Sequence, residues 1–168
     1  MAKKAILVVS FGTSVNATRE KTIDRIEADI QKAMPDRAFY RAWTSGMIIR
    51  KIEKRDDVHI NTVEEAMKQM LLDGITDVIV QPTHVIRGIE YDQLKEAVLE
   101  RRSQFEQVRI GTPLLTTSKD ADEVIQAVME EIGTIKKRRK QLYLWDMELL
   151  NDSNSNLYRT GSAVKRNW

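Results

Sequence analysis

Short apolar runs alternate with amphipathic segments along the first 133 residues of this chain. Residues 5–9 form a continuous run rich in β-branched side chains, a pattern typical of a parallel strand that is covered on both faces. Residues 38–43, 77–80 and 108–110 are further runs of this kind, and stretches with helical spacing separate them. We therefore predict an α/β fold, with an open, mainly parallel four-stranded sheet and helices on both faces, as in a flavodoxin-like lobe.

The helical segments carry start and stop signals. Thr62 and Glu65 have the spacing of a capping box, and Gly74 follows the apolar helical face that begins there. A last helix is expected to begin near Ser118 and to end at Gly133, because glycine is a common helix terminator. The four strands and these helices would together form a single lobe over residues 1–135.

The remaining segment, residues 136–168, differs in character from the lobe. Residues 136–140 are all lysine or arginine, residues 142–145 have the composition of one further strand, and residues 151–156 are polar and of low complexity. We expect this basic and polar tail to be less well ordered than the lobe.

Composition excludes several classes of function. The 27 basic and 25 acidic residues nearly balance, so no large positive field favours nucleic acid as a partner. The chain has no cysteine, which excludes disulfides, thiolate metal sites and a cysteine nucleophile. The apolar stretch near the N-terminus, residues 5–10, is too short for a signal peptide or a membrane span, so we expect a cytoplasmic protein that does not enter the membrane.

The chemistry of the chain is expected in the segment 79–93. His84 and Arg87 follow a strand directly, and Glu90 lies at the start of the next helix, the place where ligands bind in open parallel sheets. A histidine with a nearby carboxylate can act as a base or bind a divalent metal, although stable metal sites use three or four ligands. The alternative is an ordinary loop with a satisfied histidine. His59, the other histidine, is expected to be a solvated loop residue.

Four blocks of sequence resemble, in order and spacing, the N-terminal half of the anaerobic cobalt chelatases of the CbiK type. The blocks are Val8-Val-Ser-Phe-Gly-Thr-Ser14, residues 41–51, His84-Val-Ile-Arg-Gly-Ile-Glu-Tyr91 and residues 111–115, and the resemblance covers about residues 3–133. It implies an enzyme that inserts Co²⁺ into the tetrapyrrole sirohydrochlorin without ATP, during cobalamin biosynthesis. Two similar α/β halves would hold the tetrapyrrole between them, with Co²⁺ as substrate and no tightly bound cofactor.

The resemblance also implies roles for individual residues. His84 and Glu90 would be the catalytic residues and the metal ligands of a partial site. Three groups of residues would bind the tetrapyrrole. The floor of its site would be formed by Ser10, Phe11, Gly12 and Thr13, and the wall by Trp43, Thr44 and Ser45. Arg87 would lie at the rim.

This sequence departs from the family in its C-terminal part. Members of the family are longer, and their principal metal-binding histidines lie in a second half, one of them in a Met-Gly-His-Gly motif that is absent here. Codons for Leu144 to Leu149 can encode Met-Gly-His-Gly when read with a two-base offset, so we hypothesise a frameshift after about Lys137. The chain would then be a truncated chelatase with weak or no activity.

Two alternatives come from other classes of protein. The first is a non-catalytic half-domain that binds a tetrapyrrole or a metal and forms a homo-oligomer to rebuild a cleft with two lobes. The second is a flavodoxin-like binder of a phosphorylated ligand at residues 10–14, where small and hydroxyl-bearing residues follow a strand.

Overall fold

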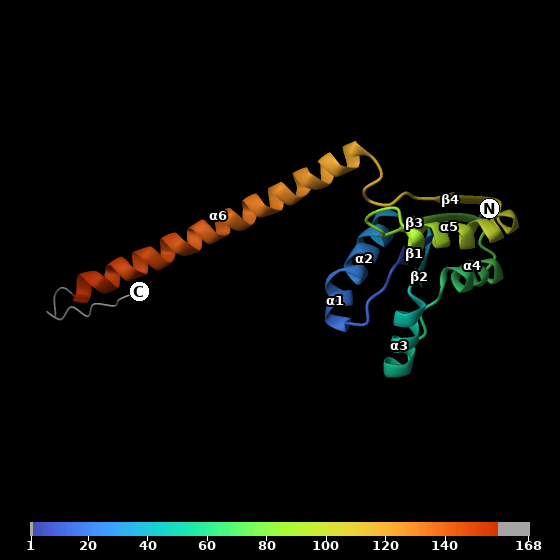
Figure 1. Ribbon diagram of the computed structural model, residues 1–168, viewed down its shortest axis with the longest axis horizontal. Coiled ribbons are helices and arrows are strands. Elements are labelled where there is room, and N and C mark those ends of the chain that lie inside the picture. Colours follow the sequence, from blue (N-terminus) through green and yellow to red (C-terminus); the bar gives the residue numbers. More distant parts are fainter. Residues whose placement is uncertain (1, 158–168) are drawn as a thin grey trace. The chain divides into compact units, whose positions relative to one another are not determined.

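The computed structural model describes residues 2–157, with side chains described as far as residue 137. Its four strands are β1 (Lys4–Ser10), β2 (Ala38–Trp43), β3 (Asp77–Pro82) and β4 (Gln107–Ile110). They form a single sheet in the order β2-β1-β3-β4, and every neighbouring pair is parallel (Figure 1). The α/β fold with four parallel strands expected from the apolar runs is therefore confirmed.

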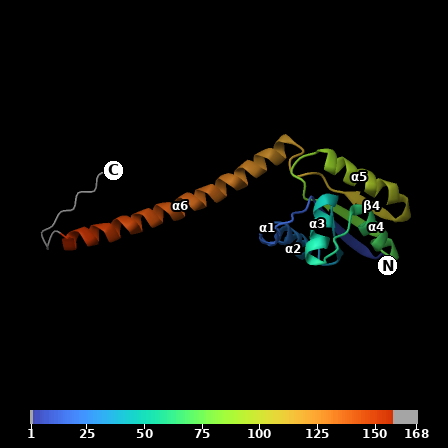
Figure 2. The same cartoon turned by 60° about the horizontal axis from the view of Figure 1, so that its bottom comes forward.

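Helices cover both faces of the sheet, as predicted (Figure 2). On one face, α4 (Val63–Leu72) and α5 (Ile89–Arg101) pack against the alternate residues of the strands. This side holds the main hydrophobic core, in which the central strands and both helices contribute side chains that are fully or almost fully buried. The core includes Leu7, Val9, Val78, Val80, Met67, Met70, Leu94 and Val98.

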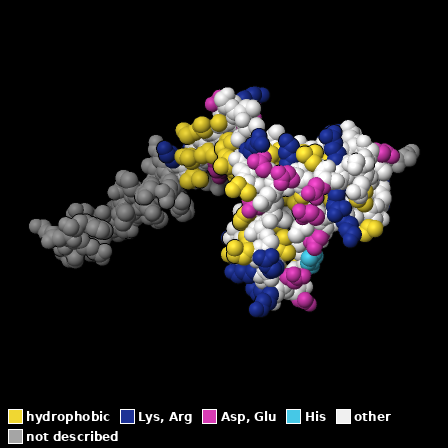
Figure 3. Space-filling model, turned by 45° about the vertical axis from the view of Figure 1, so that its right-hand side comes forward, with side chains coloured by type: hydrophobic (Ala, Val, Ile, Leu, Met, Phe, Trp, Pro, Cys, Tyr) yellow, Lys and Arg dark blue, Asp and Glu magenta, His cyan; other side chains and the backbone are white. Residues whose placement is uncertain are grey.

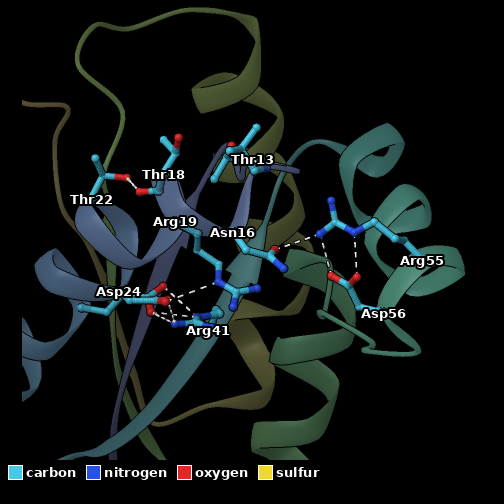
Figure 4. Close-up of polar contacts among 11 residues, drawn as sticks. Thr13, Asn16, Thr18, Arg19, Thr22, Asp24, Arg41, Arg55 and Asp56 are labelled. Carbon is cyan, nitrogen blue, oxygen red and sulfur yellow. Dashed lines mark hydrogen bonds and ion pairs between the residues drawn. The ribbon is translucent and has the colours of Figure 1, made fainter.

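On the opposite face, α1 (Asn16–Lys21) and α2 (Ile23–Ala33) lie beside β1 and β2. Glu27 of α2 is buried and accepts hydrogen bonds from Arg41 of β2, with a Nε to Oε2 distance of 2.7 Å. Arg41 also contacts Asp24, and Arg19 completes this ion-pair network (Figure 4). Burial raises the pKa of Glu27, and the guanidinium of Arg41 opposes that effect. The ion pair joins α2 to the sheet, but both charges lose part of their hydration when it forms.

A third helix, α3 (Gly46–Asp56), follows β2 and forms a small second core. Ile49 and Ile52 of α3 pack there with Trp43 and Ile60. Ser45 is the N-cap residue of α3, but its side chain makes no capping hydrogen bond.

The capping box predicted for α4 is present. The backbone N–H of Glu65 donates to Thr62 Oγ1 at 3.3 Å, and the backbone N–H of Thr62 donates to Glu65 Oε2 at 2.8 Å. Gly74 lies one residue beyond the C-cap, Asp73, and has a φ of 72°. A short 3₁₀ helix, η1 (Arg102–Gln104), connects α5 to β4.

The last helix, α6 (Ser118–Leu157), corrects two predictions. It does not end at Gly133, and the strand expected at residues 142–145 lies within it. One glycine inside a helix costs only about 1 kcal/mol, and the lysine, arginine, glutamine and leucine residues that follow it favour helix.

The chain divides into two compact units after Ser118. Whether residues 136–168 form a separate, less ordered tail stays a prediction, and residues 158–168 lie outside the described part of the chain. Within the described residues, none of the helices combines the length and the apolar character that a membrane crossing requires.

Candidate functional site

The candidate site lies at the carboxyl ends of β1 and β3, where the strand order reverses. In the sheet, β2 lies on one side of β1 and β3 lies on the other. The chain segments that leave the carboxyl ends of β1 and β3 therefore diverge, which leaves room for a ligand between them. Ser10 ends β1 and is buried, and Thr83 follows β3. Thr83 Oγ1 donates to Ser10 Oγ at 2.8 Å, which joins the two strand ends. Thr83 was not predicted, although a hydroxyl beside His84 at a strand end is a usable signal.

The loop after β1 packs directly on Trp43. Gly12 has a φ of 96°, and a Cβ atom placed on it would lie 2.6 Å from Trp43 Cε3. The backbone N–H groups of Thr44 and Ser45 donate to the carbonyl oxygens of Ser10 and Phe11, at 3.0 and 3.2 Å. The structure therefore brings together the residues predicted for the floor and the wall of the site.

Two side chains hold the far end of this loop (Figure 4). Arg55, near the end of α3, donates to the carbonyl oxygen of Ser14 at 2.5 Å and to Asn16 Oδ1 at 2.8 Å. Asp56 accepts two hydrogen bonds from the same guanidinium at 2.6 Å. Neither residue was predicted, because sequence spacing does not show that α3 returns to the loop after β1.

His84 lies in the loop between β3 and α5, and the loop after β4 fixes its backbone. Leu114 N–H donates to the carbonyl oxygen of His84 at 2.9 Å, and Leu115 N–H donates to that of Val85 at 2.7 Å. The hydroxyl of Tyr91 donates to the carbonyl oxygen of Gly111 at 3.2 Å, which ties α5 to the same loop.

Unpartnered polar atoms concentrate at this edge of the sheet. Among the described residues, six carry buried side-chain nitrogen or oxygen atoms without a hydrogen-bond partner, and four of the six lie here. The atoms at this edge are both ring nitrogens of His84, Oε2 of Glu90, Oγ1 of Thr44 and Nε1 of Trp43. Buried polar groups in native proteins are nearly always satisfied, so such a concentration is typical of a site that receives water, an ion or a ligand.

The electrostatic surroundings of His84 favour the neutral imidazole. Burial lowers the pKa of His84, and the negative charge of Glu90 only partly opposes this effect. A neutral ring keeps one nitrogen lone pair free to accept a proton or to bind a metal ion. The charge of Glu90 thus acts on His84. The catalytic and metal-binding roles expected of the two residues stay predictions.

Arg87, in contrast, points toward solvent. Its Nε lies 3.0 Å from Asp92 Oδ1, and the side chain of Arg87 is 71% exposed. An exposed pair of this kind contributes little to stability, which leaves Arg87 available at the rim of the site.

Exposed apolar side chains lie at the same edge of the sheet as these polar atoms. They come from the loops and helix starts that follow β1, β2, β3 and β4, and only Phe11 was predicted. The apolar rim consists of Phe11, Met47, Val85, Ile86, Ile89 and Leu114. The adjacent apolar residues Val85 and Ile86, inside a loop, are the sequence signal that would have identified it. Clusters of exposed apolar residues mark sites for large apolar ligands or partner proteins.

Of two pockets in the lobe, the smaller lies beside predicted site residues. One of about 240 Å³ opens beside Trp43 and Thr44 and is also lined by residues of α4 and α5. The larger pocket, about 580 Å³, is lined by residues of η1, β4 and the end of α5 and includes none of the predicted site residues. We assign the site to the switch point, because the unpartnered polar atoms lie there.

Metal ligands are few in the described part of the chain. No group of three histidine, aspartate or glutamate side chains there is placed to hold a metal ion. Metal binding by His84 and Glu90 stays a prediction. His59 is half exposed, as expected for a loop residue, and its ring nitrogens face Glu53 at 3.0 Å and Glu65 at 3.4 Å.

These features define an open α/β lobe with a candidate ligand site at its topological switch point. The chain belongs to the cobalt chelatase (CbiK) family, which it matches over residues 4–153. This match extends into the segment expected to be an atypical tail, and the frameshift hypothesis stays a prediction.

Two relatives of this chain are sirohydrochlorin cobaltochelatases. The chain is 39% identical to a sirohydrochlorin cobaltochelatase of Salmonella typhimurium over 142 residues, which cover 84% of this chain and 54% of that protein. It is 29% identical to the sirohydrochlorin cobaltochelatase CbiKC of Nitratidesulfovibrio vulgaris, over 82% of this chain and 49% of that protein. The chain thus spans about half the length of these relatives.

Proposed function

We propose that this chain supplies one lobe of a sirohydrochlorin cobaltochelatase. In this proposal the tetrapyrrole rests on the apolar rim, and His84 and Glu90 face the metal ion and the pyrrole nitrogens. The supporting observation is the set of unpartnered buried atoms on His84, Glu90, Thr44 and Trp43, at the same edge of the sheet as the exposed side chains of the apolar rim. The relatives' names identify the tetrapyrrole and the metal.

The chemistry of metal insertion suits this pair of residues. When a divalent ion replaces the two N–H protons of a tetrapyrrole, two protons must be accepted and the ion must be released from the protein. A neutral His84 can accept one proton at a ring nitrogen, and the carboxylate of Glu90 can accept the other. Two weakly placed ligands also hold the ion less firmly than a closed site with four ligands, which favours its transfer.

The remaining predicted residues would position the macrocycle. Phe11 and its apolar neighbours would contact the ring, and the Ser10–Trp43 floor would set its depth. Arg87 at the rim would attract the carboxylate arms of sirohydrochlorin, because guanidinium groups pair well with carboxylates. Co²⁺ is a substrate in this scheme, and a tightly bound cofactor and entry into the membrane are not part of it. A cytoplasmic location, expected from the sequence, belongs to the same proposal.

A second candidate is a half-domain that binds the tetrapyrrole without inserting metal. It is favoured by the two-residue ligand set, because no third histidine or carboxylate within the described residues joins His84 and Glu90. We accordingly expect metal insertion by this chain to be weak.

Absorption spectroscopy separates the two candidates. Sirohydrochlorin is added to the purified chain without metal, and Co²⁺ is added afterwards. A shift of the tetrapyrrole bands on the first addition, followed by slow conversion to the cobalt complex, supports the chelatase lobe. A shift without conversion supports the half-domain, and the absence of any shift contradicts both.

The two histidines offer a matched control. His84→Gln is expected to slow metal insertion by at least about 100-fold, the usual contribution of a positioned acid or base. His59→Gln, which changes a histidine outside the site, is expected to leave the rate unchanged. Equal rates for the two variants would exclude His84 from the reaction.

A further inference from the structure

The loop after β1 carries part of the candidate site and has little packing of its own. We call residues 11–15 the floor loop, which follows β1 and precedes α1. Within the lobe, none of its residues belongs to either hydrophobic core. A segment with so few buried apolar contacts opens easily unless hydrogen bonds hold it in place.

One guanidinium holds the far end of the floor loop (Figure 4). Arg55 Nη1 donates to the carbonyl oxygen of Ser14 at 2.5 Å, and Arg55 Nη2 donates to Asn16 Oδ1, at the start of α1, at 2.8 Å. Asp56 accepts from Nε and Nη2 of the same group, both at 2.6 Å. A guanidinium is planar and its N–H groups have fixed directions, so the contact with Asp56 sets the plane in which the other N–H groups meet the loop.

Both ends of the floor loop are therefore attached to the same part of the lobe. At the near end, Gly12 packs on Trp43, and the indole shares a hydrophobic core with Ile52 of α3. At the far end, Arg55 and Asp56 belong to the last turn of the same helix. All of these contacts lie inside the first compact unit of the chain, so they do not depend on any segment beyond it.

We propose that Arg55 is a positioning residue of the candidate site, which holds the floor loop against Trp43 before a ligand arrives. A loop that is already ordered has less conformational entropy to lose on binding, so the site gains affinity. The ligand in this inference is the tetrapyrrole, and to that extent the inference rests on the proposed function. Removal of the guanidinium should weaken tetrapyrrole binding by about tenfold, through the loop and not through the core.

Two further variants separate this role from an effect of charge alone. Acidic and basic side chains are interspersed over the visible face of the lobe, so a single charge contributes little to the field at the site (Figure 3). Lys54→Gln removes a positive charge from the neighbouring, exposed position of α3 and should bind the tetrapyrrole as the unaltered chain does. Arg55→Lys keeps the charge but loses the planar fork, so it should bind as weakly as Arg55→Gln.

Hydrogen exchange of the ligand-free chain tests the floor loop itself. The backbone N–H groups of Ser45 and Val15 have their acceptors in this loop, the carbonyl oxygen of Phe11 and Thr13 Oγ1. In Arg55→Gln both amides should exchange about tenfold faster, while the amides of β1 keep their rates because the sheet stays folded. Equal rates for Ser45 and Val15 in Arg55→Gln and Lys54→Gln would overturn the proposal.

Absorption titration with sirohydrochlorin, without metal, tests the effect on binding. Binding that is about tenfold weaker in Arg55→Gln and in Arg55→Lys, and unchanged in Lys54→Gln, supports the proposal. Equal affinities of Arg55→Gln and Lys54→Gln would contradict it. Unshifted tetrapyrrole bands with the unaltered chain would instead contradict the proposed function, and the exchange rates would still decide whether Arg55 fixes the floor loop.

Discussion

At the scale of single residues, the contact between Gly12 and Trp43 decides the shape of the candidate site. Gly12 has a positive φ, and its Cα faces the indole ring so closely that no side chain fits between them. The loop after β1 can therefore lie flat on Trp43 only if residue 12 is glycine.

Replacing Gly12 tests this contact, and Gly74 provides a matched control. Both glycines have positive φ values, 96° and 72°, but a Cβ atom on Gly74 would meet nothing within 4 Å. Gly74→Ala should lower the free energy of unfolding by about 1 kcal/mol, the cost of the backbone conformation alone. Gly12→Ala should cost about 1 to 3 kcal/mol more, because the new methyl group overpacks against the indole. Urea denaturation measures both, and equal losses would contradict a tight contact at Trp43.

The residues of the site were predicted with different success, for a physical reason. Ser10, Thr44 and His84 lie at or within two residues of strand ends. The carboxyl ends of parallel strands must meet at one edge of the sheet. Strand order alone therefore brings such residues together. Arg55 reaches the site from the end of a helix, and that position depends on how α3 packs against Trp43 and Ile60. Sequence spacing carries no information about that packing.

At the scale of secondary-structure elements, His59 connects two helices. Its ring faces Glu53 of α3 and Glu65 of the α4 capping box, and both nitrogens must carry protons to donate to both carboxylates. The hydrogen bond with Glu53 raises the pKa of His59, and Glu65 adds to this effect. The link between α3 and α4 is therefore strongest when the imidazole is charged.

This link predicts a specific dependence on pH. Because the pKa of His59 is higher in the folded chain than in the unfolded chain, its stabilisation is present below the unfolded pKa of about 6.5 and is lost as the pH rises through the folded value. Half exposure limits the effect to less than about 1 kcal/mol. The unaltered chain should exceed His59→Gln in stability at pH 5.5, and the difference should shrink by pH 8.5. Thermal or urea unfolding across this range measures it, and a difference that grows with pH would contradict the ion pairs.

Helix boundaries could be predicted where a side-chain capping interaction fixes them, and not elsewhere. The α4 capping box is a local interaction between Thr62 and Glu65, so its sequence spacing is sufficient to identify it. The end expected at Gly133 was inferred from residue type alone. The neighbouring helix formers outweigh a single glycine, and α6 continues through it.

At the scale of the whole molecule, the sheet and its helices contain their own core. All members of both hydrophobic clusters lie between Ala5 and Ile110, and the chain divides into two units after Ser118. The alternation of strands and helices was sufficient to predict this lobe, because burial of each apolar face requires that arrangement. The length of α6 was not predictable in the same way, since its apolar spacing does not show where the helix ends.

A shortened chain tests whether the lobe folds without α6. Residues 1–118 contain both cores, so their free energy of unfolding should equal that of the lobe in the full chain within about 0.5 kcal/mol, the usual effect of changes outside a core. Trp43 is the only tryptophan of the shortened chain, and Trp145→Phe with Trp168→Phe leaves the same single reporter in the full chain. Urea denaturation followed by fluorescence then compares the same probe in both. A loss of several kcal/mol on shortening would show that residues beyond Ser118 complete the core.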